Sequence, residues 1–343
     1  MRNRFCVCHV AFLVSFAACD GQAAQVHQFD GPTMGSTYEV KYVGAVPVSL
    51  VRAVVEAELA QFDLAFSNWR EDSEIACCNR HASTAPFAAS ARFLAVLQQA
   101  LDVAAATEGA FDPTVKPLSD LYRRAKRDPQ HRFDERAAAA ACERIGWRNV
   151  EVRDRAVHKK RPDVELDLDG IVAGACVDAI AQRLDALSVE AFYLQITGEV
   201  YCRGEKAPGV PWQIGVEDPA SVGTAVGAPI RTLPLRDRAL CTSGCYRNAV
   251  PANGRVLHHI FDPRTGKGAS RGVVSVSVLA DSAALADALG TAFVVLGESE
   301  TLRLLPTTSR LLPTLRRHAE IGVLFLLEGE DGCCREVEVA WPR

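Results

Sequence analysis

A histidine pair beside an Asp-Pro turn precedes a helix-like segment that carries an acid and a hydroxyl. The string HHIFDPRTG runs from His258 to Gly266, and DSAALADALGT runs from Asp281 to Thr291. Asp287 and Thr291 are four positions apart, so a helix would place them on one face. Their oxygens suit Mg²⁺, which leaves positions open for substrate phosphate, and a histidine can take up a proton near neutral pH. Together these residues predict a metal-assisted phosphate reaction.

Each of these residues also has an ordinary explanation. Asp287 and Thr291 are compatible with a solvated acid and a packed hydroxyl on an amphipathic helix. His258 and His259 are adjacent, so in a strand they would point to opposite faces and only one can belong to a site. The case for chemistry therefore depends on further motifs.

A second acidic segment has the sequence VELDLDGI and runs from Val164 to Ile171. We predict a strand over residues 164–168 that turns at Gly170 into a helix, which places Asp167 and Asp169 on the same side. Two neighbouring acids are costly unless a metal or another polar ligand lies close by. The alternative is a charged strand end in solvent.

The elements that must position these residues mix helices and strands without regular alternation, which favours an α+β fold in a single domain. Apolar spacing predicts helices over residues 49–67, 91–107, 134–145, 172–187 and 282–296, with Asp281 as the N-cap of the last. Strands are predicted over residues 38–43, near 150 and 157, and over 164–168, 191–196, 212–216, 230–235, 239–242, 255–261, 273–279, 323–327 and 337–340.

Composition limits the class of function. The chain has 343 residues, of which 48% are hydrophobic, so it can bury a large core. Its net charge of −4 and its pI near 6.1 argue against nucleic-acid binding, which needs a basic face.

The first residues predict export. Residues 1–18 read as a signal peptide with Arg2 and Arg4 before an apolar run, and its end resembles a bacterial lipoprotein signal with Cys19 as the lipidated residue. Asp20 resembles the signal for inner-membrane retention. We therefore expect a periplasmic inner-membrane lipoprotein that touches the membrane only through a lipid anchor, with a linker over 19–29 and one domain over 30–343. Cleavage near Ala23 or Ala24, giving a soluble exported form, is the alternative.

Cysteines are numerous for an exported chain, where the environment allows disulfides. Nine follow Cys19, which is an odd number, so at least one thiol has no partner within the chain.

Eight motifs in order resemble the ApbE family of FAD:protein FMN transferases, over about Asp30 to Gly297. They are TMGS (33–36), NWREDSEI (68–75), AFDPTV (110–115), ELDLDGI (165–171), WQIGVEDP (212–219), TSGCYR (242–247), HHIFDPRTG (258–266) and ADALGTAFVVLG (286–297). The resemblance implies an α+β, T-fold-like domain built of two related β-α-β halves.

The resemblance also implies a reaction and its residues. FAD would be the substrate and Mg²⁺ the cofactor, with FMN passing to a Thr or Ser hydroxyl of another protein and AMP leaving. His259 would be the base, and Asp287 and Thr291 would hold the metal with a carbonyl from the Gly170 turn. The residues implied at the FAD site are Met34, Trp69, Ala110, Phe111, Asp112, Asp167, Ala173 and Ile260.

The implied acceptors are periplasmic domains of redox proteins, such as subunits of the sodium-translocating NADH:quinone reductase type. Three positions depart from the family pattern: Ala173, Cys245 and the segment from Thr197 to Glu199. Two alternatives stay open, a non-catalytic FAD-binding lipoprotein and a pyrophosphatase that hydrolyses FAD to FMN and AMP.

Overall fold

A computed structural model describes residues 25–219, 229–246, 248–269, 272–311, 321–329 and 334–341. The predicted signal peptide, Cys19 and Asp20 lie outside the described residues. Among the helices that are described, none combines the length and the apolar character needed to cross a membrane.

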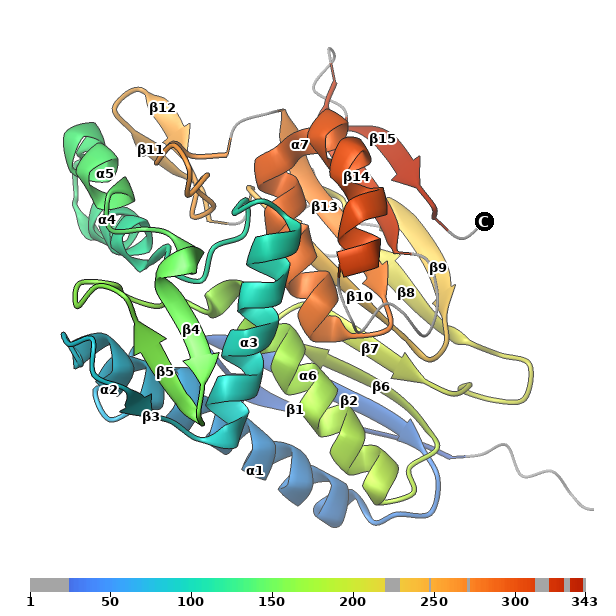
Figure 1. Cartoon of the computed structure of the whole chain (residues 1–343). Coiled ribbons are helices and arrows are strands. Elements are labelled where there is room, and N and C mark those ends of the chain that lie inside the picture. Colours follow the sequence, from blue (N-terminus) through green and yellow to red (C-terminus); the bar gives the residue numbers. More distant parts are fainter. Residues whose placement is uncertain are drawn as a thin grey trace, which may run out of the picture.

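The centre of the molecule is an antiparallel eight-stranded sheet with the order β1-β2-β6-β7-β10-β13-β14-β15 (Figure 1). Its strands are β1 (Val26–Thr33), β2 (Ser36–Val43), β6 (Ala191–Ile196), β7 (Glu199–Arg203), β10 (Arg238–Gly244), β13 (Val273–Ala280), β14 (Gly322–Glu328) and β15 (Cys334–Val339). Each half of the sheet contains four strands, and helical sequence separates its first strand pair from its second. The predicted α+β fold is confirmed, with each half a ββ-α-ββ unit.

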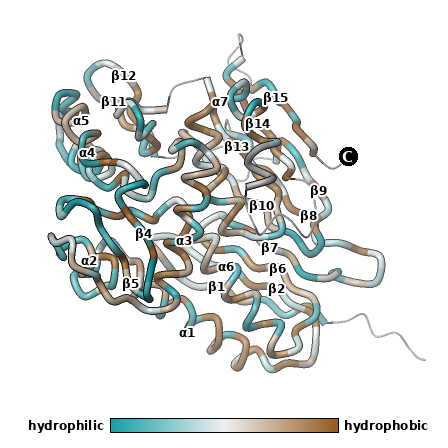
Figure 2. The backbone as a smooth tube through the Cα atoms, in the orientation of Figure 1, coloured by the Kyte–Doolittle hydropathy of each residue, from teal (hydrophilic) through white to brown (hydrophobic). Residues whose placement is uncertain are grey.

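Long helices cover one face of this sheet and form the main core with it (Figures 1 and 2). They are α1 (Val48–Phe66), α6 (Asp169–Ala186) and α7 (Ala283–Leu311), and α3 (Ala91–Ala106) packs on these helices. Helices α6 and α7 cross with their backbones in contact, because a Cβ on Gly174 would lie 2.3 Å from the Ala283 carbonyl oxygen. This crossing brings the start of α6 next to the middle of α7.

A hairpin covers part of the other face. Strands β8 (Trp212–Val216) and β9 (Arg231–Leu235) pack on β7, β10, β13 and β14 through a second core. That second core includes Trp212, Ile214, Cys202, Leu240 and Leu324. The side chains of β1, β2 and β6 on this face, including Gln28, Lys41 and Tyr193, instead line a large cleft.

Smaller elements surround the sheet. They are α2 (Glu74–Arg80), the sheet β3-β5-β4 (Phe87–Ala88, Ala156–Lys159, Val150–Arg153), α4 (Lys116–Arg127), α5 (Glu135–Cys142), a 3-10 turn (Trp147–Asn149) and the hairpin of β11 (Val250–Ala252) and β12 (Arg255–Leu257). A third apolar cluster joins α4 and α5 to Val250 and Phe261. This cluster fixes α4 against the segment that follows β12.

Where the acidic and histidine motifs lie, one predicted strand is absent and another is shorter than predicted. Residues 164–168 form no strand, because the Asn79 side chain takes the place of a neighbouring strand: its Oδ1 accepts from Leu166 N at 2.6 Å and its Nδ2 donates to Leu166 O at 2.9 Å. Strand β12 ends at Leu257, so both histidines lie in a loop that crosses the cleft wall.

The ends of two other elements also differ from expectation. Asp281 does not cap α7: the Ser282 hydroxyl accepts from Leu285 N, and the Asp178 carboxylate of α6 accepts from Ala283 N and Ala284 N. Strand β1 begins at Val26, inside the predicted linker, because its pairing with β2 extends to Val43. The sequence did not predict α4, although Pro117 in its first turn and apolar Leu118 and Tyr122 fit a helix start.

Seven of the described cysteines that follow Cys19 are free thiols, namely Cys77, Cys78, Cys142, Cys176, Cys202, Cys241 and Cys245. Cys333 lies outside the described residues.

Candidate active site

One cleft of about 1370 Å³ gathers most of the predicted site residues. Its walls come from α4, the 110–115 turn, the start of α6, the β6–β7 turn, β8, β10, α7 and the loop after β12. The predicted residues that line it are Trp69, Ala110, Phe111, Asp112, Asp167, Gly170, His259, Ile260, Asp287 and Thr291. Its volume exceeds that of a typical small-ligand pocket, so it has room for a dinucleotide.

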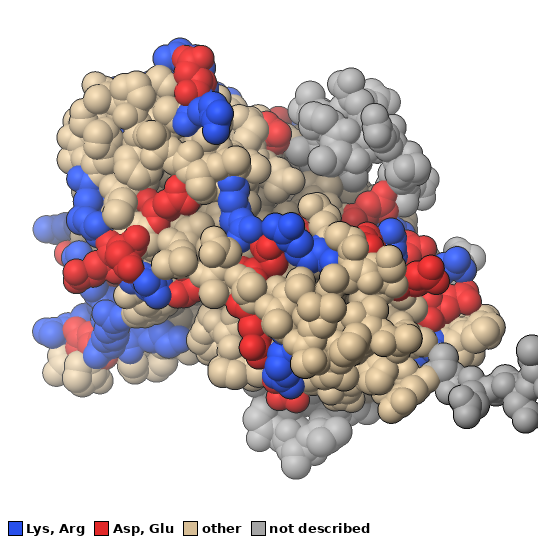
Figure 3. Space-filling view, turned by 90° about the horizontal axis from the view of Figure 1, so that it is seen from below, with Lys and Arg blue, Asp and Glu red and all other residues tan. Residues whose placement is uncertain are grey.

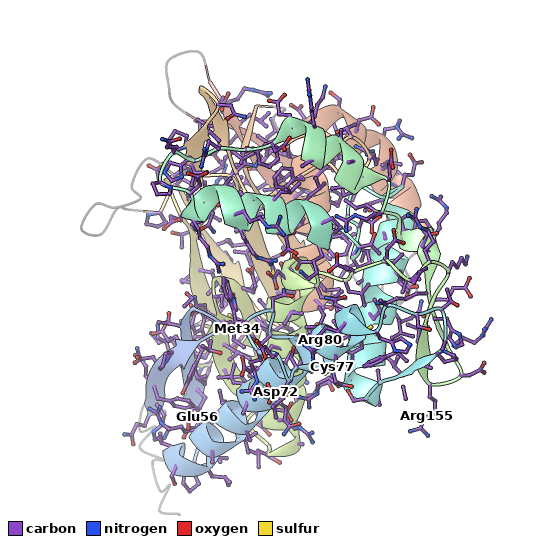
Figure 4. The ribbon with its side chains drawn as sticks, turned by 90° about the vertical axis from the view of Figure 1, so that its left-hand side faces the viewer. Met34, Glu56, Asp72, Cys77, Arg80 and Arg155 are labelled. Atoms are coloured by element: carbon purple, nitrogen blue, oxygen red, sulfur yellow. The ribbon has the colours of Figure 1, made fainter. Side chains whose placement is uncertain are left out.

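Two predicted residues do not line the cleft. Met34 lies at the tip of the β1–β2 hairpin with a φ of 46° and is 38% exposed (Figure 4). Ala173 is half-buried on α6. With its single methyl group, Ala173 cannot supply a polar contact to a ligand from that position.

The candidate metal end lies where α6 meets α7. Asp287 is buried, and its Oδ2 accepts from the Gly174 N–H at 3.1 Å. The Thr291 hydroxyl lies 3.4 Å from the Ser243 hydroxyl, and a Cβ on Gly170 would lie 3.2 Å from Thr291 Oγ1. An acid, a hydroxyl and the backbone of the Gly170 turn therefore converge at the contact between the two helices.

The electrostatics of Asp287 favour a cation. Burial raises its pKa to about 7, and the nearby Asp169 and Asp178 act in the same direction. The described residues contain no cluster of three or more His, Cys, Asp and Glu side chains that could hold a metal. An oxygen-only site with one buried carboxylate suits Mg²⁺ bound together with substrate phosphate, rather than a fully protein-enclosed transition metal.

The acidic segment at the start of α6 is balanced by an arginine that sequence reasoning missed. Arg123 of α4 lies 3.1 Å from the Asp167 carboxylate and 2.8 Å from that of Asp169. The Asn68 side chain donates to Asp169 Oδ1 at 2.8 Å. Arg123 and Asn68 therefore hold Asp167 and Asp169 side by side.

The 110–115 turn shapes the floor of the cleft. The buried Asp112 carboxylate accepts from Thr114 N at 2.8 Å and from Trp147 N at 2.9 Å. Burial raises the pKa of Asp112. A Cβ on Gly170 would lie 3.2 Å from the Phe111 ring, so this turn packs directly on the start of α6.

The two adjacent histidines lie in different surroundings, as predicted, although they lie in a loop and not in a strand. His258 is buried behind the loop, whereas His259 is exposed to the cleft with its ring 6.3 Å from that of Tyr122. Partial desolvation, followed by the influence of His258 and Lys126, lowers the pKa of His259 to about 4. His259 is therefore neutral at pH 7 and can accept a proton.

The other two departures from the family pattern lie in the β6–β7 turn and at the end of β10. Thr197, Gly198 and Glu199 line the cleft at the β6–β7 turn, where Thr197 has a φ of 54°. This backbone region favours glycine, so threonine here is strained. Cys245 is half-buried at the end of β10 and packs against the main core.

The sequence of the chain is similar to those of known ApbE proteins. The ApbE family model matches residues 34–312. The chain is 33% identical over 329 residues to an FAD:protein FMN transferase of Vibrio cholerae, covering 94% of this chain and 93% of that protein. It is also 33% identical over 305 residues to an FAD:protein FMN transferase of Haemophilus influenzae, covering 85% and 87% of the two chains.

Solved structures agree with this result. The flavin transferase ApbE from Vibrio cholerae superposes with a TM-score of 0.77 at 30% identity, covering 92% of this chain and 97% of that one. The apo form of the Pseudomonas stutzeri flavinyl transferase ApbE gives a TM-score of 0.76 at 30% identity, with coverage of 92% and 94%.

Proposed function

The chain belongs to the ApbE family, and we propose that it is a Mg²⁺-dependent FAD:protein FMN transferase. The observation that carries this proposal is the convergence of Asp287, Thr291 and His259 on one cleft large enough for FAD. Relatives that match nearly the whole chain bear the same activity in their names.

The metal would be held by Asp287, Thr291 and a backbone carbonyl of the Gly170 turn. The fit rests on the buried Asp287 carboxylate, which has one N–H donor and a raised pKa. When bound, Mg²⁺ would neutralise charge on the diphosphate. The Ser243 hydroxyl, 3.4 Å from Thr291 Oγ1, would help to orient the Thr291 side chain.

The proposed reaction is a phosphoryl-type transfer with balanced bonds. The oxygen of a Thr or Ser hydroxyl on the acceptor protein forms a bond to the phosphorus of the FMN half. The bond from that phosphorus to the bridging oxygen breaks, and AMP leaves with that oxygen. His259 takes the hydroxyl proton. General-base catalysis of this kind typically raises the rate by about 10²–10⁴-fold.

The low pKa of His259 is compatible with this role. A neutral imidazole is needed to receive the proton, and it is present at pH 7. A bound diphosphate would add negative charge nearby and raise the pKa of His259 towards neutrality, which would make it a stronger base.

The remaining cleft residues would bind and orient the dinucleotide. Trp69 is 74% exposed and Phe111 forms part of the floor, so both offer aromatic surface to a flat ring. Asp167 and Ile260 belong to motifs that are far apart in the sequence, but both residues line the cleft. Ala173 and Met34, which do not line it, are not assigned a contact.

We further propose that the protein is exported and lipid-anchored, and that its acceptors are periplasmic domains of redox membrane proteins. This rests on the apolar N-terminal segment that ends at Ala17, Ala18 and Cys19. Replacing Cys19 with Ser in the full chain should release the protein from membranes into the periplasmic fraction if the anchor is correct. Equal membrane retention of both forms would reject it.

The activity is tested by intact-mass spectrometry. The protein is incubated with FAD, Mg²⁺ and an acceptor domain that bears a reactive threonine, with a Thr→Val acceptor as the control. The proposal predicts that the acceptor gains the mass of one FMN and that AMP appears in equal amount. AMP and FMN without any mass gain, across several acceptors, would show hydrolysis instead of transfer.

A further inference from the structure

Helix α4 presents a basic face to the cleft for which the predicted FAD and metal residues do not account. The residues of α4 that line the cleft follow helical spacing, and they are Ser119, Tyr122, Arg123, Lys126 and Arg127. The helix lies at the periphery beside α5 (Figure 1), and the third apolar cluster fixes it there. Its basic residues therefore reach the cleft from outside the main core.

Arg123 is already neutralised by acids of the protein. Its guanidinium lies 3.1 Å from Asp120, 3.1 Å from Asp167 and 2.8 Å from Asp169. Arg123 is therefore suited to hold the two acids of the α6 segment in place, and its charge is not available to a ligand.

Lys126 and Arg127 are different. Lys126 Nζ donates to the Asn248 side-chain oxygen at 2.9 Å, and the Arg127 guanidinium lies 5.2 Å from the centre of the Trp69 ring. Within the described part of the chain, the ion pairs of α4 with carboxylates are made by Lys116 and Arg123, and not by Lys126 or Arg127. Both side chains are exposed and line the cleft. Two unbalanced positive charges in a concave site attract an anion.

The positions of these charges indicate which anion they would bind. Lys126 is close enough to His259 to influence its ionisation, and Arg127 lies against Trp69. One charge therefore lies beside the proposed base and the other beside a proposed ring contact. An acidic segment of the acceptor protein is the other anionic candidate. FAD is favoured because Lys126 and Arg127 lie among the cleft residues proposed to bind it.

We propose that Lys126 and Arg127 form a metal-independent subsite for the diphosphate of FAD. This proposal rests on the proposed transferase function and deepens it by adding residues that recognise the substrate. Arg123 carries one positive charge against the two carboxylates of Asp167 and Asp169, so together with Asp287 the cleft keeps an excess of acids that would repel a dianionic ligand. The two α4 charges offset that repulsion before any metal is bound.

The test compares two charge-removing variants of the same helix. In the first, Lys126→Gln and Arg127→Gln are combined. In the matched control, Arg124→Gln removes one exposed charge that does not line the cleft. FAD and riboflavin are each titrated by flavin fluorescence, with EDTA and again with Mg²⁺. Riboflavin carries the flavin ring without phosphate, so it separates phosphate recognition from ring binding.

The subsite predicts that the double variant raises the Kd for FAD by about tenfold or more, with and without Mg²⁺, because charge-assisted hydrogen bonds are lost. Its Kd for riboflavin should equal that of the wild type, and Arg124→Gln should change neither value. The FAD affinity of the wild type should also fall more steeply with salt than that of the double variant.

Three results would overturn the subsite: an unchanged Kd for FAD, an equal loss of riboflavin binding, or an equal effect of Arg124→Gln. An unchanged Kd for FAD with a raised KM for the acceptor would assign the α4 charges to the acceptor instead. A wild-type protein that binds no FAD would reject the proposed function itself, so the two failures are distinguishable.

Discussion

The two walls of the cleft are built in different ways. The wall that carries Asp287, Thr291 and Gly170 belongs to α6 and α7, which are packed inside the main core. The other wall, α4, rests on a small separate cluster and is rich in hydrophilic residues (Figure 2). Groups that need fixed geometry therefore lie on rigid, buried elements, and groups that supply charge lie on a peripheral helix.

This difference indicates where substitution should be tolerated. A change on the α6–α7 side disturbs both the site and the core, whereas a change on the exposed face of α4 should alter binding without unfolding the protein. Figure 3 shows Lys, Arg, Asp and Glu interspersed over the face seen from below, so the outer surface there has no large region of one charge. The unbalanced charges of α4 are a local feature of the cleft.

The largest expected effect is on the core side. Asp287→Asn keeps the size of the side chain but removes the charge that would bind Mg²⁺. We expect kcat/KM for transfer to fall by about a thousandfold, because several kcal/mol of charge stabilisation are lost. Steady-state kinetics at saturating Mg²⁺ measure this. Activity within a factor of ten of the wild type would move the metal site away from α7.

The stability of this wall should also depend on pH. The pKa of Asp287 is raised to about 7 in the folded protein. Because the folded protein keeps this proton at pH values where the unfolded chain loses it, the folded state has the full stabilisation below the unfolded-state pKa of about 4. This stabilisation is lost as pH rises to about 7. Without metal, the wild type should therefore lose stability over this range relative to Asp287→Asn, and Mg²⁺ should restore it. Thermal melts with EDTA and with Mg²⁺ test this, and parallel pH profiles of the two proteins would contradict it.

A third change tests how closely α6 and α7 pack where they cross. In Gly174→Ala the new Cβ would lie 2.3 Å from the backbone oxygen of Ala283. Alanine favours a helix over glycine by about 1 kcal/mol, but overpacking against backbone costs about 1–3 kcal/mol or more. We expect a net loss in the free energy of unfolding, measured by urea denaturation. Gly268→Ala, whose Cβ would meet no atom closer than 3.9 Å, is the control and should be near neutral.

The smallest effect is expected at the β6–β7 turn, on the rim between the two walls. Thr197 has a φ of 54°, so Thr197→Gly should relieve strain and stabilise the protein by about 0.5–1 kcal/mol. Thr37→Gly in the neighbouring strand β2 should destabilise it, because glycine weakens an extended strand. Chemical denaturation of both variants checks the sign, and a destabilised Thr197→Gly protein would mean that the threonine side chain makes a contact that outweighs the strain.

The same contrast explains what could be predicted from the sequence. Asp287 and Thr291 were placed correctly on one helix because their spacing follows from helical geometry. Residues 164–168 alternate like a strand, yet their backbone partners are the distant Asn79 side chain and Pro113, which no local pattern reveals. Long-range hydrogen bonds therefore set the conformation of residues 164–168.

The α4 wall was missed for a different reason. Its segment is strongly charged, and its apolar stripe of Leu118, Tyr122 and Ala125 is short. That stripe packs on Phe261, far away in the chain, so the contacts that place Lys126 and Arg127 at the cleft are not local ones. The ion pair between Arg123 and Asp167 is likewise invisible in sequence, because it joins two elements that fold together.

We propose above that His259 takes the proton from the acceptor hydroxyl, and the two walls should hold the substrate without this side chain. The most direct test is a single-turnover experiment with His259→Ala, FAD, Mg²⁺ and excess acceptor, followed by intact-mass spectrometry. We expect the variant to bind FAD with the affinity of the wild type and to transfer FMN at a rate lower by about 10²–10⁴-fold. Transfer at the rate of the wild type, with FAD bound equally well, would contradict this role of His259.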